Sequence, residues 1–196
     1  MKSSHYSFKP LNIGRIVIWS LFALALAIAP LLFKSSLALT MLSQIGYLII
    51  ICLSYNILLG QGGMLSFGHA VYTGLGSFIA IHAMNMAGQP IPLVLIPLVG
   101  GVAGLGFAVL LGFVTTKKSG TTFAMITLGI GELVASMALM FPEFFGGEGG
   151  ITTNRVYGQS FFGITFGPAI QVYYLIAVYC FICTAAMFAF TGTPLG

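Results

Sequence analysis

Long apolar runs, separated by short polar or glycine-rich stretches, dominate the pattern of this sequence. A membrane-spanning helix needs about 20 consecutive, mainly apolar residues. Segments of about that length lie at about 16–33, 37–59, 64–87, 91–114, 121–141 and 168–190. The pattern therefore predicts an all-α integral membrane protein: one transmembrane domain, 1–196, with about six helices and glycine-interrupted segments.

The composition agrees with a chain solvated by lipid. Of the 196 residues, 58% are hydrophobic and only 5% are charged, whereas a soluble domain carries about 25% charged residues. Disordered chains are poor in apolar residues, so the same numbers exclude disorder. Nucleic-acid binding is not expected, because Lys117 and Lys118 are the only adjacent basic pair and phosphate binding needs clustered positive charge.

The basic residues predict an orientation, because cytoplasmic loops are enriched in Lys and Arg. A cytoplasmic N-terminus puts more basic residues inside than outside. The inside set would be Lys2, Lys9, Arg15, Lys117 and Lys118, and the outside set Lys34 and Arg155. We therefore expect the N-terminus to be cytoplasmic.

Small residues recur every fourth position in the fourth apolar segment, at Gly100, Gly104, Ala108 and Gly112. Such a stripe lets two helices approach closely and predicts a helix-packing face. The cysteines lie inside apolar runs, where packing is their expected role. No metal site and no cofactor are predicted, because the histidines and cysteines lack ligand spacing.

An irregular stretch is expected at 142–167, outside the cytoplasm in this orientation. It contains Gly146, Gly147, Gly149 and Gly150, with aromatic residues at Phe144, Phe145, Tyr157, Phe161 and Phe162. Loops of this length are often functional, and aromatic pairs favour the membrane interface. A functional loop and a surface loop with an aromatic anchor both remain open.

Glu132 lies near the middle of the fifth apolar segment. A charge at the bilayer centre costs about 2.5–3.5 kcal/mol on insertion scales, so it must be paired, protonated or facing water. Helical spacing puts Gly129, Glu132 and Ser136 on one face, with Thr127 and Gly131 nearby in sequence. This strip could line a polar path, or Glu132 could bond a neighbouring helix.

The stretch from Gln61 to His69 interrupts the apolar pattern between the second and third segments. Its notable residues are Gln61, Gly62, Gly63, Ser66, Gly68 and His69. Glycine-interrupted segments are the usual sequence indication of a transporter's binding region. His69 could carry a proton, although a structural hydrogen bond is the simpler interpretation.

An enzyme would need Ser66, His69 and Glu132 to act together, but no nucleophile elbow surrounds the serine. A P-loop is also excluded, because Lys117 occupies the position before Lys118-Ser119 where glycine is required. A proton-coupled carrier using Glu132 and His69 remains an alternative. ATP hydrolysis, if it drives transport, is expected on separate subunits.

Three segments together resemble the permeases of branched-chain amino-acid ABC transporters. They are Asn56–Ala70, Phe123–Glu132 and the glycine-rich Gly146–Ile151, and the order is closer to the LivM type. The resemblance covers about residues 37–196. It departs from the family at Glu148-Gly149, where members often have Pro-Asn.

The resemblance implies a subunit of an ATP-driven amino-acid importer in a bacterial inner membrane. Its partners would be a paralogous permease, two cytoplasmic ATPase subunits and a periplasmic substrate-binding protein. Related permeases carry urea or short amides, so that alternative stays open. Thr193–Gly196 is similar to the start of the family's cytoplasmic coupling loop, so we expect this chain to be the N-terminal part of a longer permease, a fragment or a truncated reading frame.

Overall fold

The structure, a computed structural model, describes residues 13–86, 91–118, 120–154, 156 and 166–193. Within these ranges the chain is helical and contains no strand, which confirms the predicted fold class. The elements in chain order are α1 (Ile13–Leu32), α2 (Ser36–Asn56), the π-helical turn η1 (Ile57–Gln61), α3 (His69–Asn85), the 3₁₀ turn η2 (Leu93–Leu95), α4 (Ile96–Thr115), α5 (Thr121–Met140), α6 (Pro142–Phe145), the 3₁₀ turn η3 (Gly147–Gly149) and α7 (Ala169–Thr191).

Local sequence explains where several helices begin. Ser35 caps α2, because its hydroxyl accepts the backbone N–H of Ala38 at 3.2 Å. Pro97 lies in the first turn of α4, and Pro142 opens α6, at positions where the missing proline N–H leaves no helical bond unmade. Gly120, with φ of 66°, precedes α5 in a conformation that favours glycine.

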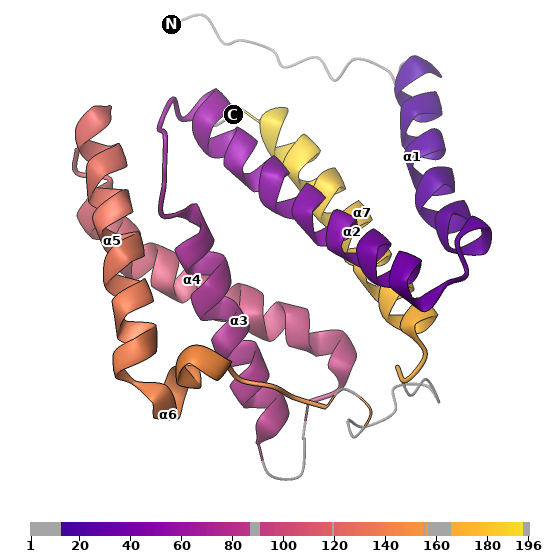
Figure 1. The fold of residues 1–196 in the computed structure, drawn as a ribbon. Coiled ribbons are helices and arrows are strands. Elements are labelled where there is room, and N and C mark those ends of the chain that lie inside the picture. The colour runs from indigo at the N-terminus through magenta and orange to yellow at the C-terminus, as the bar shows by residue number, and fades with distance from the viewer. Residues whose placement is uncertain (1–12, 87–90, 119, 155, 157–165, 194–196) are drawn as a thin grey trace, which may run out of the picture.

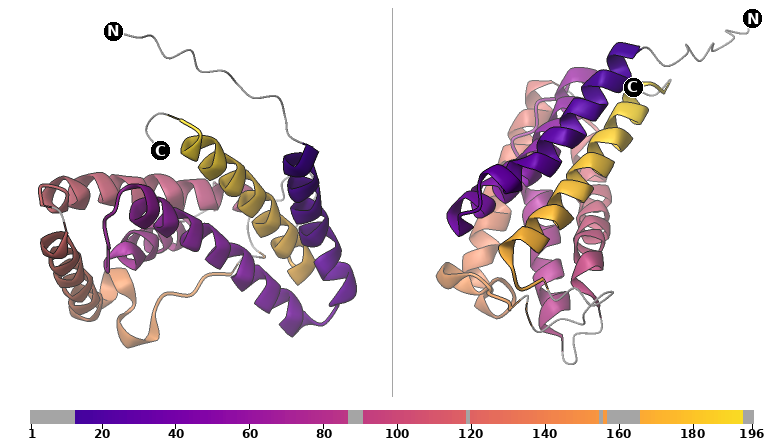
Figure 2. Two further views of the ribbon diagram at one scale, coloured as in Figure 1. Left: turned by 90° about the horizontal axis from the view of Figure 1, so that it is seen from above. Right: turned by 90° about the vertical axis from the view of Figure 1, so that its right-hand side faces the viewer.

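The helices form two groups (Figure 1). In one, α2 lies along α7 with α1 beside them; in the other, α3 crosses α4, with α5 and α6 alongside. Seen from above, α5 and α1 lie at opposite edges of the molecule (Figure 2, left). The helices α1 and α7 are antiparallel, so that α1 begins and α7 ends at the same end of the bundle.

Aromatic and hydrogen-bond contacts hold the first group together around α7. The ring of Trp19 packs edge-on against Phe181 at 5.5 Å between centroids. The Tyr173 hydroxyl donates to the Leu26 carbonyl at 2.8 Å. Cys180 is completely buried in α7, and the cysteines of the described residues are free thiols.

Glycine contacts hold the second group together at the crossing of α3 and α4. A Cβ on Gly76 would lie 2.6 Å from the Gly100 carbonyl oxygen, and one on Gly104 would lie 3.2 Å from that of Tyr72. The two backbones therefore touch, as small residues permit. Of the stripe predicted on α4, Gly100 and Gly104 make these contacts, whereas a Cβ on Gly112 would meet nothing within 4 Å.

Four helical stretches are long and apolar enough to cross a membrane: Ser36–Gln61, Leu93–Thr115, Thr121–Met140 and Ala169–Thr191. A shorter apolar stretch covers Ile16–Leu32. Helix α3 has 17 residues, about 25 Å of rise, because the segment expected to begin at 64 becomes helical only at His69. Val102 is 72% exposed on α4 and Phe113 70%, so these faces suit contact with lipid.

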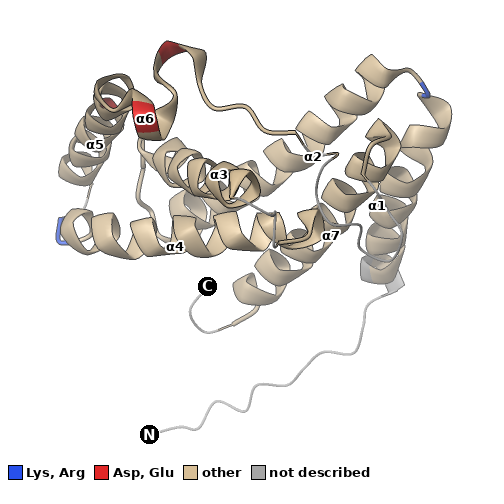
Figure 3. Cartoon of the chain, turned by 90° about the horizontal axis from the view of Figure 1, so that it is seen from below, with Lys and Arg blue, Asp and Glu red and all other residues tan. Residues whose placement is uncertain are grey.

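Charged side chains are sparse and gather at the ends of the helices (Figure 3). Lys117 and Lys118 follow α4, at the end where α1 begins and α7 ends. Lys34, Glu143 and Glu148 belong to the turns at the opposite end. Among the described charged side chains, Glu132 is the exception, since it lies within α5.

Candidate functional site

The chain between α2 and α3 leaves the helical path through a π-helical turn. The backbone N–H groups of Gly62, Gly63 and Met64 donate to the carbonyls of Ile57, Leu59 and Leu58, each at 3.2 Å. Gly63 has φ of 60°, a conformation that favours glycine. The sequence thus places the break at the glycines, as the interrupted apolar pattern indicates.

A polar seam joins this break to α5; we define it as Ser66, Phe67, Gly68 and Thr127. The Phe67 N–H donates to the Thr127 hydroxyl at 3.1 Å, and that hydroxyl donates to the Ala124 carbonyl at 2.9 Å. A Cβ on Gly68 would lie 2.6 Å from the Thr127 carbonyl oxygen. Ser66 and Thr127 are buried, at 4% and 1% exposure, so these two residues place the contact between the non-helical segment before α3 and helix α5 in the interior.

His69 begins α3 and contacts α2. Its Nε2 and the Ser54 hydroxyl lie 2.7 Å apart, within hydrogen-bond distance, and its ring meets Tyr55 edge-on at 5.7 Å. Through Gly68 and His69, the start of α3 is therefore tied to α5 on one side and to α2 on the other. Sequence spacing could not find the Ser54 contact, because it joins residues from different helices.

Glu132 lies apart from this seam, on an exposed face of α5. Gly129, Glu132 and Ser136 are all exposed, and the Ser136 hydroxyl donates to the Glu132 carbonyl at 2.9 Å within the helix. A Cβ on Gly129 or on Gly131 would meet nothing within 4 Å. No hydrogen bond among the described residues joins Glu132 to Ser66 or His69, so a triad of these three residues is not assembled here.

Gln61 is exposed at the end of the π-helical turn. It lines a small cavity, about 190 Å³, with Asn56, Thr184 and Thr191 among its polar wall residues. This cavity lies between the end of α2 and the end of α7, away from the seam.

The glycine-rich segment after α5, residues 142–150, folds back on itself in a compact bend, which we call the elbow. Gly146, Gly147 and Gly150 have φ of 78°, 59° and 65°, and a Cβ on Gly146 would collide with the Gly150 carbonyl. Gly149 lies in the 3₁₀ turn. Part of the stretch expected to be irregular is thus helical, in α6 and η3. Tyr157, Phe161 and Phe162 of the aromatic-anchor interpretation lie outside the described residues.

One face of α3, missed by the sequence analysis, holds this elbow. Phe78 packs edge-on against Phe145 at 4.9 Å, and the His82 ring stacks on Phe144 at 4.7 Å. The His82 Nε2 lies 2.7 Å from the Phe144 carbonyl oxygen. Asn85 continues the face by donating to the Thr152 carbonyl at 3.3 Å. The helical spacing of Phe78, His82 and Asn85 was the available signal.

In the part of the chain that the structure describes, no group of three or more His, Cys, Asp or Glu residues could hold a metal ion. The features of the site are therefore a backbone break, a seam of small and hydroxyl-bearing residues and one exposed acid.

The comparisons with known proteins cover most of the chain. Residues 37–196 match the family described as "Branched-chain amino acid transport system / permease component". The high-affinity branched-chain amino acid transport system permease protein LivM of Salmonella typhimurium is 29% identical, in an alignment that covers 76% of this chain and 39% of the relative. LivM of Escherichia coli is 28% identical over the same shares.

This chain thus spans about two fifths of the length of the curated relatives that it matches, 39% in each case. No solved structure matches it. The family match includes the break between α2 and α3, the whole of α5 and the glycine-rich elbow. On this match, the chain belongs to the family of branched-chain amino acid transport system permease components.

Proposed function

We infer that this chain is a permease subunit of an ATP-driven importer for branched-chain or related amino acids, in a bacterial inner membrane. It would form the translocation path with a paralogous permease. Two cytoplasmic ATPase subunits would supply the energy, and a periplasmic binding protein would deliver the solute. The N-terminus would be cytoplasmic, with Lys117 and Lys118 on the same side. Family membership and the similarity to the LivM permeases support this proposal.

The observation that carries the proposal is the polar seam. Irregular backbone at membrane depth is tolerated where it is buried in protein or lines a cavity, and broken helices mark the binding regions of many transporters. Here the broken segment is buried at Ser66 and bonded to α5 through Thr127. A bundle built only to anchor a protein needs no such interruption.

The exposed strip of α5 would face the path. Glu132 is exposed on a helix that otherwise presents apolar side chains such as Met125, at 71% exposure, and Leu133, at 57%. An acid in that setting requires water or a polar partner. We propose that this face lies against the paralogous permease, with water between the two subunits.

A proton-coupled carrier is the second candidate, because Glu132 forms no ion pair with the described residues and is open to its surroundings. The two candidates differ in energy source. Uptake of labelled leucine would be measured in cells that lack their own system and express this permease with its transport partners. Uptake that survives a protonophore but stops with ATPase-inactive partners supports the importer; the reverse result supports the carrier.

Glu132→Gln separates the same candidates by a second route. In the importer the amide keeps the hydrogen-bonding capacity, so uptake should stay within about twofold; in a carrier that cycles a proton it should be abolished. Thr122→Val is the control on the same helix, since Thr122 is exposed on α5 and lies outside this strip. Competition by excess urea or acetamide against labelled leucine tests the alternative that the permease carries short amides.

A further inference from the structure

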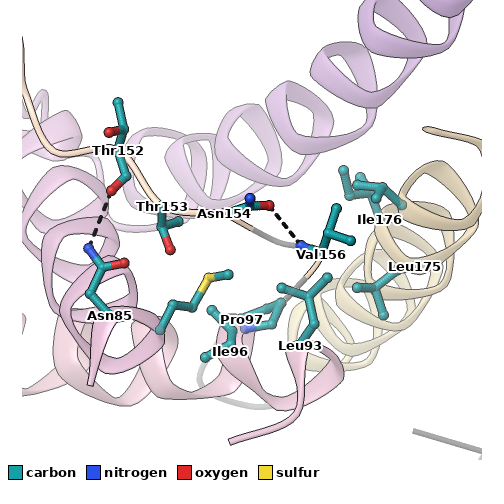
Figure 4. A pocket seen from close by; sticks show the side chains of 12 residues that line it. Asn85, Leu93, Ile96, Pro97, Thr152, Thr153, Asn154, Val156, Leu175 and Ile176 are labelled. Carbon is teal, nitrogen blue, oxygen red and sulfur yellow. Dashed lines mark hydrogen bonds between the residues drawn. The ribbon is translucent and has the colours of Figure 1, made fainter. Parts of the chain in front are cut away.

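A cavity of about 900 Å³ opens at the end of the bundle where α3 ends and where α4 and α7 begin (Figure 4). It lies at the opposite end of α3 from the polar seam. Ligand sites for small molecules have volumes of about 300–1,000 Å³ and are lined mainly by apolar residues with a few placed polar groups. The volume of this cavity and its mainly apolar lining, with a few polar residues, fit this description.

One wall is aliphatic. Leu93 belongs to η2 and Ile96 begins α4, and Leu175 and Ile176 come from α7. No Lys, Arg, Asp or Glu is among the described residues that line the cavity. A charged side chain would lose its hydration against these aliphatic residues, whereas a branched aliphatic group would gain contact.

The other wall is polar and is held in place. The Asn85 amide donates to the Thr152 carbonyl at 3.3 Å, and the Val156 N–H donates to the Asn154 side-chain oxygen at 3.0 Å. The first bond holds Thr152 against the end of α3, and the second is local to Asn154 and Val156. The Asn85 side-chain oxygen points toward the cavity in Figure 4.

Thr153 supplies an unsatisfied group in this wall. Its Oγ1 is buried and has no hydrogen-bond partner among the residues that the structure describes, although buried polar groups in proteins are nearly always paired. A ligand that bonds to this hydroxyl would supply the missing partner. The unpaired hydroxyl is an observation independent of the shape of the cavity.

We propose that this cavity binds a small neutral zwitterion with a branched aliphatic side chain, an amino acid of the leucine type. The Asn85 oxygen would accept a hydrogen bond from the ammonium group, and the Thr153 hydroxyl would donate to the carboxylate. The side chain would lie against Leu93, Ile96 and Leu175. The proposal deepens and rests on the proposed function: it places a solute site within this subunit, before the path between the two permeases.

Direct binding tests the site. The full chain, purified into lipid nanodiscs, would be titrated with tritiated leucine in a scintillation proximity assay. Thr153→Val removes the hydroxyl at nearly constant volume and should weaken binding by roughly 3- to 10-fold, the usual effect of one hydrogen bond. Val156→Trp, at a side chain that is 53% exposed and lines the cavity, should narrow the cavity and weaken binding at least 10-fold. Unlabelled isoleucine should compete, and lysine and glutamate should not.

Ser77→Ala is the matched control, because Ser77 is exposed on α3 and bonds only to the Thr73 carbonyl in the same helix. It should bind leucine like the unaltered chain. Equal leucine binding by the unaltered chain and by Val156→Trp would overturn the proposal, as would equal competition by lysine. A thermal unfolding scan of each variant identifies any that fails to fold.

Uptake in cells distinguishes this proposal from the proposed function. If the unaltered permease imports leucine and both cavity variants import it with unchanged kinetics, the site is wrong and the function stands. If no leucine is imported but the chain binds it in a manner sensitive to Val156→Trp, the site stands and the importer is wrong.

Discussion

The crossing of α3 and α4 and the middle of α5 use the same residue type in opposite ways. At the crossing, Gly76 and Gly100 bring two backbones into contact. In α5, Gly129 and Gly131 have open space where a Cβ would be. The first pair is required for packing inside this chain. The second pair is not required for packing among the described residues, so any need for it must come from contacts outside them.

Gly76→Val should have the largest effect of any single change considered. Its Cβ would lie 2.6 Å from the Gly100 carbonyl oxygen, and a backbone atom cannot rotate away. Overpacking of this kind costs about 3 kcal/mol of unfolding free energy. The measurement is the unfolding midpoint of the chain in detergent micelles. Gly74→Val is the control, because it introduces the same β-branched residue in the same helix where a Cβ meets nothing within 4 Å. An equal loss of stability in both variants would contradict the contact between Gly76 and Gly100.

Gly68→Ala should have the second-largest effect on stability, because the added methyl group would push the non-helical segment before α3 away from α5. The new Cβ would lie 2.6 Å from the Thr127 carbonyl oxygen, so the seam must open, at a cost of about 2 kcal/mol. Hydrogen exchange at the Phe67 amide, which donates to Thr127, would report the separation by becoming faster. Gly131→Ala, which meets nothing within 4 Å, serves as the control and should leave the exchange rate unchanged.

Thr127→Val should have a smaller effect. It keeps the shape of a side chain that is 1% exposed but leaves the Phe67 N–H without its acceptor. An unpaired buried donor costs about 1–2 kcal/mol, and hydrogen exchange at the Phe67 amide should quicken accordingly. Thr122→Val, at an exposed position of the same helix, should change neither quantity.

Gly129→Ala should have the smallest effect on the isolated chain. Alanine favours a helix over glycine by up to about 1 kcal/mol, so the unfolding midpoint should stay equal or rise. The same variant tested for leucine uptake would sharpen the comparison. A chain that is stable but transports poorly would assign the Gly129 face to a partner, whereas unchanged uptake would leave that face to lipid.

The break between α2 and α3 was predictable because local chemistry decides it. Three glycines and a glutamine interrupt the apolar run over 60–63, and the helical path ends there in the structure. The hydrogen bond from Phe67 to Thr127 was not predictable in this way. It joins residues 60 positions apart, and only the mutual placement of α3 and α5 brings them together.

The stripe on α4 shows a different limit. Helical spacing places Gly100, Gly104, Ala108 and Gly112 on one face, but two helices that cross diverge on either side of their closest point. Contact with Gly76 therefore falls near Gly100 and Gly104, and Gly112 lies beyond it. A sequence repeat gives the face of a helix, whereas the crossing angle decides how many of its members touch a neighbour.

Helix α3 is fastened at both of its ends to different neighbours. At its start, His69 lies within hydrogen-bond distance of Ser54 in α2. At its end, His82 and Asn85 contact the backbone of the segment after α5, at Phe144 and Thr152. A rod of about 25 Å hardly compresses along its axis, so an axial displacement at the start of α3 would arrive at its end almost undiminished. The shortest of the main helices is thereby a mechanical link between the contact with α2 and the glycine-rich segment after α5.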